Sequence, residues 1–268
     1  MTSAKVAAIS SHWHVAGASV CGASHHKSGL PCQDAHSWRE LPNGGLVLAV
    51  ADGAGSAPLS QIGAARAAIA AVDWISESVT AQQPETDDEW HEMLLASMRS
   101  AHEAVQQAAE NRGVAARELA TTLILMVALP EVAVAAQVGD GAAVVMLDAQ
   151  HMTAVTAPQS GEFINETTFF TASNYLDFVQ FGIRRGRVEG IAAFSDGLQL
   201  LALRMPEATP HKAFFTPFFK MVSDNEDSWE TQQHLQRFLR SDRIKQRADD
   251  DLTLVVGTLH HLVKQDGK

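Results

Sequence analysis

Four aspartates adjoin apolar, strand-like runs of the sequence, and a fifth lies upstream of them. Asp52 follows LVLAVA, Asp140 follows VAVAAQVG, Asp196 follows GIAAFS, and Asp250 lies just before LTLVVG; Asp34 is the upstream residue. Turn chemistry explains one aspartate at a strand end, because aspartate is a poor strand former. Several carboxylates at the ends of buried strands, however, would repel one another unless a cation bound between them. The set therefore predicts a site for a hard divalent ion such as Mg²⁺ or Mn²⁺, provided that the strand ends meet in space.

Glycine directly follows two of these aspartates, Asp52 and Asp196. A glycine lets the backbone approach an ion closely, so the carbonyl of Gly53 is a candidate ligand. Neither a GxxxxGK[ST] nor a GxGxxG nucleotide cradle occurs in the sequence, and there is no CxxxxxR phosphatase loop.

The elements that must position these residues occur as runs of strands with helices grouped between them. Apolar runs and turn signals predict strands over 46–51, 119–129, 132–138, 142–147, 188–194 and 252–259, with weaker signals over 151–155, 166–171 and 178–184. Helical spacing predicts helices over 60–77, 87–111, 198–204, 211–222 and 228–242, with the Phe-rich stretch 214–219 as a packing face broken near Pro217. This order indicates an α+β fold with antiparallel sheets, in a single domain over 1–268.

Composition excludes several classes of protein. The chain has 268 residues, with 20 Lys and Arg against 31 Asp and Glu, a formal net charge of −11 that argues against a general nucleic-acid binder. No apolar run is long enough for a membrane-spanning helix, and the N-terminus lacks the apolar core of a secretory signal. Cys21 and Cys32 form no CxxC motif, and the histidines form no paired Cys/His set typical of structural zinc sites. We therefore expect a reduced, cytoplasmic protein with no membrane or nucleic-acid partner.

Several short motifs in order resemble the metal-dependent protein phosphatases of type 2C, over about residues 15–259. They are Gln33-Asp34, Asp52-Gly53, Gly63-Ala64, Thr121-Thr122, Gly139-Asp140-Gly141, Ser195-Asp196-Gly197 and Asp250-Asp251-Leu252-Thr253. Gly161-Glu162 and Asn165-Glu166-Thr167 also resemble a bacterial subgroup. The resemblance implies two antiparallel sheets packed as a sandwich, flanked on both outer faces by helices. It also implies a binuclear Mn²⁺/Mg²⁺ centre at one edge of that sandwich.

Carried over position by position, the resemblance implies a role for each aspartate. Asp52 would bridge both ions, and the Gly53 carbonyl would bind one of them. Asp196 and Asp250 would complete the ligands of the other ion, and Asp140 with Asp196 would bind a third, looser metal. Asp34 would hold metal-bound water. Such a water, bridging two ions, becomes hydroxide-like near neutral pH and can attack a phosphoryl group in line, without a phosphoenzyme.

The sequence departs from the family pattern at three places. The arginine that grips the phosphate in many members is replaced by Gly29, and His25, His26 and Lys27 are nearby sources of positive charge; an exposed polar loop is the alternative reading. The histidine that follows the Asp-Gly motif in some members is Ala54, which leaves a metal-bound water or His36 as proton donor. The last motif contains three successive aspartates, 249–251, and Leu252-Thr253 favours Asp250 as the ligand.

The resulting hypothesis is a Mn²⁺/Mg²⁺-dependent phosphatase of phosphoserine and phosphothreonine in proteins. Catalytic roles fall to Asp34 and Asp52, substrate binding to His26 and Lys27, and metal binding to Asp52, Gly53, Asp196, Asp250 and Asp140. Small bacterial members often oppose a Ser/Thr kinase, so a kinase or its targets is the expected partner of a monomeric protein. A hydrolase of another phosphate ester and an inactive binding module remain as alternatives. A flap over 159–181 would be a source of substrate selectivity.

Overall fold

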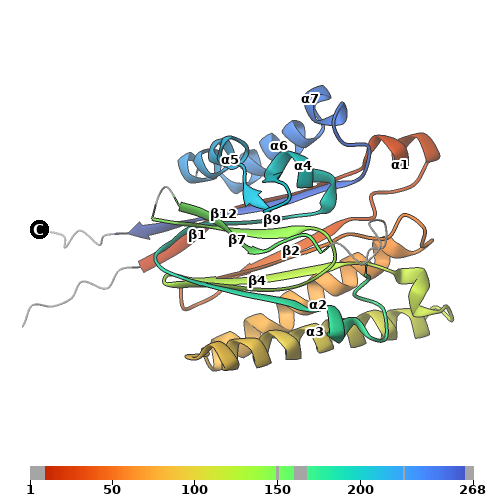
Figure 1. The fold of residues 1–268 in the computed structure, drawn as a ribbon, viewed down its shortest axis with the longest axis horizontal. Coiled ribbons are helices and arrows are strands. Elements are labelled where there is room, and N and C mark those ends of the chain that lie inside the picture. Colours follow the sequence, from red (N-terminus) through yellow and green to blue (C-terminus); the bar gives the residue numbers. More distant parts are fainter. Residues whose placement is uncertain (1–9, 149–150, 160–167, 226, 263–268) are drawn as a thin grey trace, which may run out of the picture.

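Two antiparallel five-stranded sheets pack face to face, with helices on both outer faces (Figure 1). This computed structural model describes residues 10–148, 151–159, 168–225 and 227–262. The first sheet has the order β1-β12-β9-β6-β7 and the second β2-β3-β4-β5-β8. The predicted α+β sandwich of antiparallel sheets is therefore confirmed.

The strands of each sheet are short, apart from two long neighbours. The first sheet contains β1 (Ser10–Val20), β12 (Leu252–Leu262), β9 (Val188–Phe194), β6 (Ala142–Leu147) and β7 (His151–Thr156). The second contains β2 (Ala35–Glu40), β3 (Leu46–Ala51), β4 (Leu123–Leu129), β5 (Val132–Val138) and β8 (Gln180–Arg185). A separate small ribbon pairs β10 (Leu203–Arg204) with β11 (Thr209–Pro210).

Burial on both faces explains why β3 and β4 are wholly apolar. In β4, Leu123, Leu125 and Val127 pack with the helices of the outer layer, whereas Ile124 and Met126 pack between the two sheets. Side chains of a strand alternate between its faces, so a strand with a layer on each side needs apolar residues at every position. The same argument applies to β3, whose six residues are all buried.

The helices form one pair on each sheet. On the second sheet lie α2 (Ser60–Ala81) and α3 (Asp87–Glu110), the latter begun by a capping box between Thr86 and Glu89. On the first sheet lie α5 (Lys212–Asp224) and α6 (Ser228–Leu239). The shorter elements are α1 (Ala23–Ser28), α4 (Gln199–Ala202), α7 (Asp242–Lys245) and the 3₁₀ turns η1 (Ala116–Leu119), η2 (Tyr175–Phe178) and η3 (Asp196–Leu198). None of the helices in the described part of the chain has the length and apolar character needed to cross a membrane.

Several expected elements need correction. The stretch 119–129 begins as η1 and becomes a strand only at Leu123, and 198–204 divides into η3, α4 and β10. Residues 168–171 are not a strand, and 166–167 lie outside the described residues. Helix α5 continues through Pro217, its sixth residue, although proline there removes one hydrogen bond to the carbonyl four residues earlier. Phe215, Phe218 and Phe219 are buried, so that stretch is a packing face, as predicted.

Three N-terminal elements, β1, α1 and β2, were not expected from the sequence. In β1, Trp13 and Val15 face the gap between the sheets, while Ala16 and Ala18 face the helices. Small residues and histidines interrupt that alternation, so the period of two is hidden. Strand β2 is the edge of its sheet and is partly exposed, which removes the need for a continuous apolar run.

Candidate active site

The ends of strands from both sheets bring Asp34, Asp52, Asp140, Asp196 and Asp250 together; we call these five residues the carboxylate cluster. Asp52 directly follows β3, Asp196 begins η3 after β9, and Asp140 lies in the turn between β5 and β6. The antiparallel pairing of Phe194 with Leu254 places the end of β9 beside the start of β12, next to Asp250. The members interact electrostatically: Asp34, Asp140 and Asp196 act on Asp52, and Asp140 and Asp250 act on Asp196. The condition set by the sequence, that the strand ends meet, is therefore fulfilled.

Two threonines fix the backbone of Asp52. The Asp52 N–H donates to Thr122 Oγ1 at 3.0 Å, and the Asp52 carbonyl accepts from Thr121 Oγ1 at 2.9 Å and from the Thr122 N–H at 2.8 Å. Both threonines are buried. These bonds continue the pairing of β3 with β4 one step beyond the strand, so the side chain of Asp52 leaves a rigid point at the sheet edge. In the sequence Thr121-Thr122 is visible as a motif, but nothing in the residues alone indicates this role.

Gly53 is a glycine because three segments converge on it. A Cβ there would lie 2.5 Å from the carbonyl oxygen of Gln33 and 2.9 Å from Cβ of Ser60, closer than real contacts allow. The close approach brings the Gln33-Asp34 segment and the start of α2 against the end of β3. The second residue of the Asp-Gly pair thus serves packing at the site, and its carbonyl remains a candidate ligand.

Asp34 is held at one carboxylate oxygen and unpartnered at the other. Ser195 Oγ donates to Asp34 Oδ2 at 2.7 Å and itself accepts from the Thr253 N–H at 3.0 Å. Asp34 Oδ1 is buried and has no hydrogen-bond partner, and the same is true of Asp196 Oδ1. Burial raises the pKa of Asp34, although the hydrogen bond from Ser195 opposes that shift. Ser195 and Thr253 are supporting residues whose role does not follow from the motifs that contain them.

The pKa values of Asp52 and Asp196 reflect the repulsion between the carboxylates. Burial raises the pKa of Asp52 well above its usual range, and the charges of Asp34 and Asp196 raise it further. Burial also raises the pKa of Asp196, as do the charges of Asp140 and Asp250. Buried acceptors without donors, arranged as an all-oxygen set with excess negative charge, fit hard divalent cations such as Mg²⁺ and Mn²⁺.

The three successive aspartates of the last motif have different surroundings. Asp249 is exposed, and its carbonyl accepts from Ser24. Asp251 is 3% exposed, and its carboxylate accepts from the Gly22 N–H at 2.7 Å and the Gln33 N–H at 2.6 Å. Asp250 is the member whose charge acts on Asp196. The structure therefore supports the register in which Asp250 joins the cluster and Asp251 fastens the backbone.

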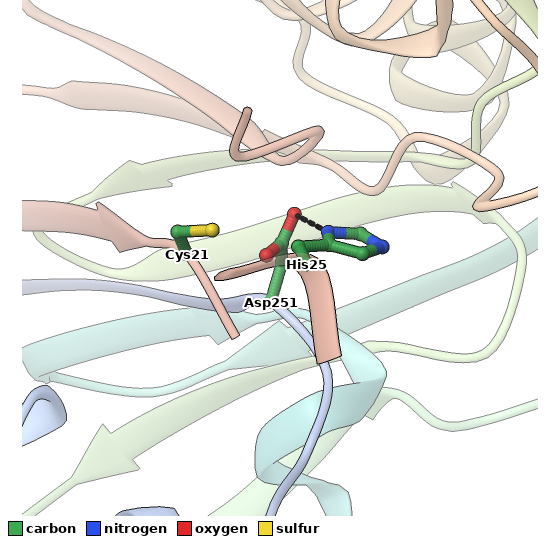
Figure 2. Close-up of side chains that lie close together, drawn as sticks. All are labelled: Cys21, His25 and Asp251. Atoms are coloured by element: carbon green, nitrogen blue, oxygen red, sulfur yellow. Dashed lines mark ion pairs between the residues drawn. The ribbon is translucent and has the colours of Figure 1, made fainter. Parts of the chain in front are cut away.

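Helix α1 carries the residues that were expected to bind substrate. His26 and Lys27 are exposed, and within the part of the chain that the structure describes neither of them contacts the carboxylate cluster. His25 instead turns inward, with Nδ1 2.9 Å from Asp251 Oδ2 (Figure 2). Gly29 has φ 69° and ends α1 in the left-handed conformation. Arginine would be strained at that backbone angle, so the departure from the family pattern involves the local backbone as well as the side chain.

His36 is poorly suited to donate a proton to a leaving group. It lies on β2 with Nδ1 2.9 Å from Ser19 Oγ, which in turn accepts from Thr253 Oγ1 at 2.7 Å. Burial lowers the pKa of His36 to about 4, so the ring is neutral at pH 7. A neutral imidazole that accepts at Nδ1 agrees with this chain of hydroxyl groups.

The lowered pKa of His36 predicts a loss of stability in mild acid. The ordinary value is 6.5 and the folded value about 4, so folding favours the neutral ring, and its contribution is lost as pH falls below 6.5. In His36→Gln, the free energy of unfolding should therefore fall about 2 kcal/mol less than in the wild type between about pH 6.5 and about pH 4.5. Urea denaturation at several pH values measures this. Replacement of the exposed His151 by glutamine is the control, and equal slopes for all three proteins would contradict the prediction.

Only part of the expected flap belongs to the described structure. Residues 160–167, including Gly161-Glu162 and Asn165-Glu166-Thr167, lie outside the described residues. Beyond them, the Phe170 N–H donates to the Thr121 carbonyl at 2.7 Å, and the buried Phe170 ring packs against His102 and Tyr175. This anchors the segment that follows residue 167 to the threonine pair behind Asp52.

One protein family and one bacterial relative match most of this chain. The family model described as protein phosphatase 2C matches residues 21–240. Serine/threonine-protein phosphatase 3 of Escherichia coli (strain K12) is 33% identical over 250 residues, which cover 91% of this chain and 97% of that protein.

Solved structures agree in fold. PppA, named as a key regulatory component of T6SS in Pseudomonas aeruginosa, has a TM-score of 0.59 at 19% identity and covers 94% of this chain and 100% of its own. The serine/threonine phosphatase of S. agalactiae has a TM-score of 0.60 at 14% identity, covering 92% of this chain and 99% of its own. At these identities the structural likeness establishes the fold alone, whereas the family match and the E. coli relative cover most of the sequence. The chain therefore belongs to the protein phosphatase 2C family and is a phosphatase enzyme.

Proposed function

We propose that the protein hydrolyses phosphoserine and phosphothreonine in proteins, at a binuclear Mn²⁺/Mg²⁺ centre, and opposes a Ser/Thr kinase. The observation that carries this proposal is the convergence of the carboxylate cluster, in which the charges of neighbouring members raise the pKa of Asp52 and of Asp196. An inactive binding module would have no reason to keep these repelling groups together. The E. coli relative, a serine/threonine-protein phosphatase, supports serine and threonine as the substrate residues.

The residues that would hold the metals all supply oxygen. Asp52 and the Gly53 carbonyl lie at the end of β3, and Asp196 and Asp250 lie at the paired ends of β9 and β12. Asp140, which acts electrostatically on both Asp52 and Asp196, would join Asp196 at a third, looser position. When bound, the ions supply an activated water and neutralise charge on the phosphoryl oxygens.

Asp34 is placed to orient the attacking water. Ser195 fixes its Oδ2, which leaves Oδ1 as a buried acceptor with no donor of its own. A water that donates to Oδ1 would be held in one orientation and could pass its proton to that oxygen. Because its pKa is raised, Asp34 accepts a proton more readily than an ordinary aspartate does.

Lys27 would attract the phosphate from the exposed side of α1. We expect Lys27→Ala to raise KM about two- to five-fold with kcat unchanged, because one exposed charge contributes roughly 0.2–1 kcal/mol of uniform binding. Steady-state kinetics with a phosphothreonine peptide measures both constants. Replacement of the exposed Lys220 on α5 by alanine is the matched control, and an unchanged KM in Lys27→Ala would remove Lys27 from the phosphate site.

The decisive experiment is hydrolysis of a phosphothreonine peptide by the purified protein, first metal-free and then with Mn²⁺ or Mg²⁺. The proposal expects activity that appears with metal and disappears in Asp196→Asn. Asp88→Asn removes an exposed carboxylate from α3 and should behave as the wild type. Phosphotyrosine peptide and a small phosphate ester are assayed in parallel.

The outcomes separate the possible substrates. Preference for the phosphothreonine peptide supports the proposal, whereas metal-dependent turnover of only the small ester would place the protein among hydrolases of another phosphate ester. A folded protein that is inactive with every metal and substrate would overturn the proposal in favour of a binding module. Gly29, in the position of the phosphate-binding arginine, would then be the first residue to examine.

A further inference from the structure

A second group of ligand-type side chains lies beside the carboxylate cluster but is chemically different from it. Cys21 follows β1, His25 lies on α1, and Asp251 precedes β12. One ligand atom from each of them lies within 4.8 Å of the other two (Figure 2). Among the described residues, no other trio of Cys, His, Asp or Glu side chains is gathered so tightly.

The backbone holds the Asp251 carboxylate in place for this trio. The Gly22 N–H donates to Oδ1 and the Gln33 N–H donates to Oδ2, at 2.7 and 2.6 Å. Each oxygen keeps a second lone pair, and the group is buried with its negative charge. The site therefore has a fixed anionic ligand before any ion arrives.

His25 offers a nitrogen that no hydrogen bond uses well. The residue is 9% exposed, and its Nδ1 lies 2.9 Å from Asp251 Oδ2. Nδ1 nevertheless belongs to the buried atoms without a properly directed hydrogen bond. A ring nitrogen that is near a carboxylate oxygen, but not aimed at it, has its lone pair available for a cation that binds both atoms.

Cys21 completes the trio, and its thiol interacts with the Asp251 carboxylate. Its Sγ lies 3.7 Å from the carbonyl oxygens of Gly22 and Leu30. Cys32 is the other cysteine, but its Sγ donates to the Asp34 carbonyl at 3.8 Å and it is not a member of the trio. Sulfur, nitrogen and one carboxylate oxygen form a set that suits Zn²⁺, whereas Mg²⁺ and Mn²⁺ prefer oxygen alone.

We propose that Cys21, His25 and Asp251 form a zinc site separate from the carboxylate cluster. Three protein ligands leave one tetrahedral position for water, and the Cys21 thiol releases its proton to solvent when the ion binds. Because Gly22 and Gln33 bracket α1 and both bond to Asp251, an ion here ties α1 to the start of β12. The ion would thereby fix the helix that carries His26 and Lys27. This site does not depend on the proposed substrate.

Co²⁺ is the probe that distinguishes the two sites, because it absorbs differently with thiolate and with oxygen ligands. One equivalent of Co²⁺ added to metal-free, reduced protein should give a sulfur-to-cobalt charge-transfer band in the near ultraviolet and intense visible bands of tetrahedral geometry. The carboxylate cluster contains no sulfur and cannot give the first band. The Asp196→Asn substitution, which weakens metal binding at the carboxylate cluster, should therefore leave the charge-transfer band unchanged.

The variants assign the ligands. Cys21→Ser should lose the charge-transfer band, His25→Gln should bind Co²⁺ at least tenfold more weakly, and Cys32→Ser should behave as the wild type. Zn²⁺ should displace the bound Co²⁺, and excess Mg²⁺ should not. Asp251 is left unchanged because it also fastens the backbone at Gly22 and Gln33.

Each contrary result overturns the proposal. Two of these results concern the wild type and Cys21→Ser: the charge-transfer band is absent from the wild type, or it persists in Cys21→Ser. The other two are an undiminished affinity of His25→Gln for Co²⁺ and the loss of the charge-transfer band in Cys32→Ser. Circular dichroism establishes that each variant is folded. If Cys21→Ser does not fold, Cys21→Ala takes its place in these measurements. As a second measurement, Zn²⁺ should raise the melting temperature of Asp196→Asn but not of the Asp196→Asn/Cys21→Ser double variant. An equal rise in both would also refute the site.

Discussion

Replacement of Asp52 by asparagine should lower kcat by roughly a thousandfold at saturating Mn²⁺. Asp52 lies at the end of β3, where two threonines fix its backbone. Its carboxylate faces the other members of the carboxylate cluster. Asparagine keeps the shape but removes the charge that would hold the metals. Metal ions contribute several kcal/mol to the stabilisation of a phosphoryl-transfer transition state, and each 1.36 kcal/mol corresponds to a factor of ten in rate.

The same substitution should leave the metal-free protein as stable as the wild type, or more stable. Burial and neighbouring negative charges raise the pKa of Asp52, so the folded state disfavours its ionised form. A carboxyl whose pKa is raised on folding destabilises the protein increasingly as pH rises above its unfolded value of 3.8. Asparagine carries no charge, and the variant therefore loses this penalty at neutral pH.

Kinetics and denaturation together test this pair of effects. Turnover of a phosphothreonine peptide is measured at saturating Mn²⁺, and urea denaturation is measured in the presence of a chelator. Mn²⁺ should then raise the melting temperature of the wild type and of Asp88→Asn much more than that of Asp52→Asn, since an ion stabilises only a fold that binds it. Near-normal kcat, or a metal-free variant clearly less stable than the wild type, would remove Asp52 from the metal centre.

The positions of the buried strands and of the aspartates were predictable because both follow from local chemistry. Strands β3, β5, β6 and β9 have the predicted bounds, since a strand covered on both faces is largely apolar and ends where a turn signal appears. An aspartate after such a strand is thereby placed at a sheet edge. What the residues alone could not give was the pairing of the strands, and it is the pairing of β9 with β12 that brings Asp196 and Asp250 together.

The N-terminal part of the site was not predictable, because long-range contacts determine it. Strand β1 has polar and small residues that hide its alternation, and α1 is a short helix whose ends are tied to Asp251, far away in the sequence. The trio of Cys21, His25 and Asp251 has no sequence spacing that could reveal it. A search for paired Cys and His motifs therefore missed this group.

The supporting residues show why short motifs extend beyond the aspartates themselves. Thr121 and Thr122 hold the backbone of Asp52, and Ser195 holds Asp34. The threonine hydroxyl groups come from the segment before β4 and the serine hydroxyl from the residue after β9, so Asp52 is fixed by its own sheet and Asp34 by the opposite sheet. The geometry of the site thus depends on how closely the layers of the sandwich approach one another.

At Gly63, α2 and η1 lie so close together that there is no room for a side chain. Gly63→Ala should therefore destabilise the protein by about 3 kcal/mol or more. A Cβ at Gly63 would collide with the carbonyl oxygen of Leu119, the last residue of η1. The side chain of Leu119 is fully buried, so this residue cannot easily move away. Helix propensity alone predicts the opposite sign, since alanine in a helix interior is favoured over glycine by about 1 kcal/mol. The sign of the change therefore decides between crowding and propensity.

The displacement should also reach the active site. Leu119 is followed by Ala120, whose carbonyl accepts from the Ala54 N–H at 2.9 Å, and by Thr121, which bonds to the Asp52 carbonyl. A shift of η1 away from α2 would therefore move both residues that flank Gly53, and we expect kcat to fall as well as stability. Gly55→Ala is the matched control, because a Cβ there meets only ordinary contacts at 3.8 and 4.0 Å. Urea denaturation and peptide turnover for both variants provide the test, and a Gly63→Ala protein more stable than the wild type would show that α2 and η1 can separate without cost.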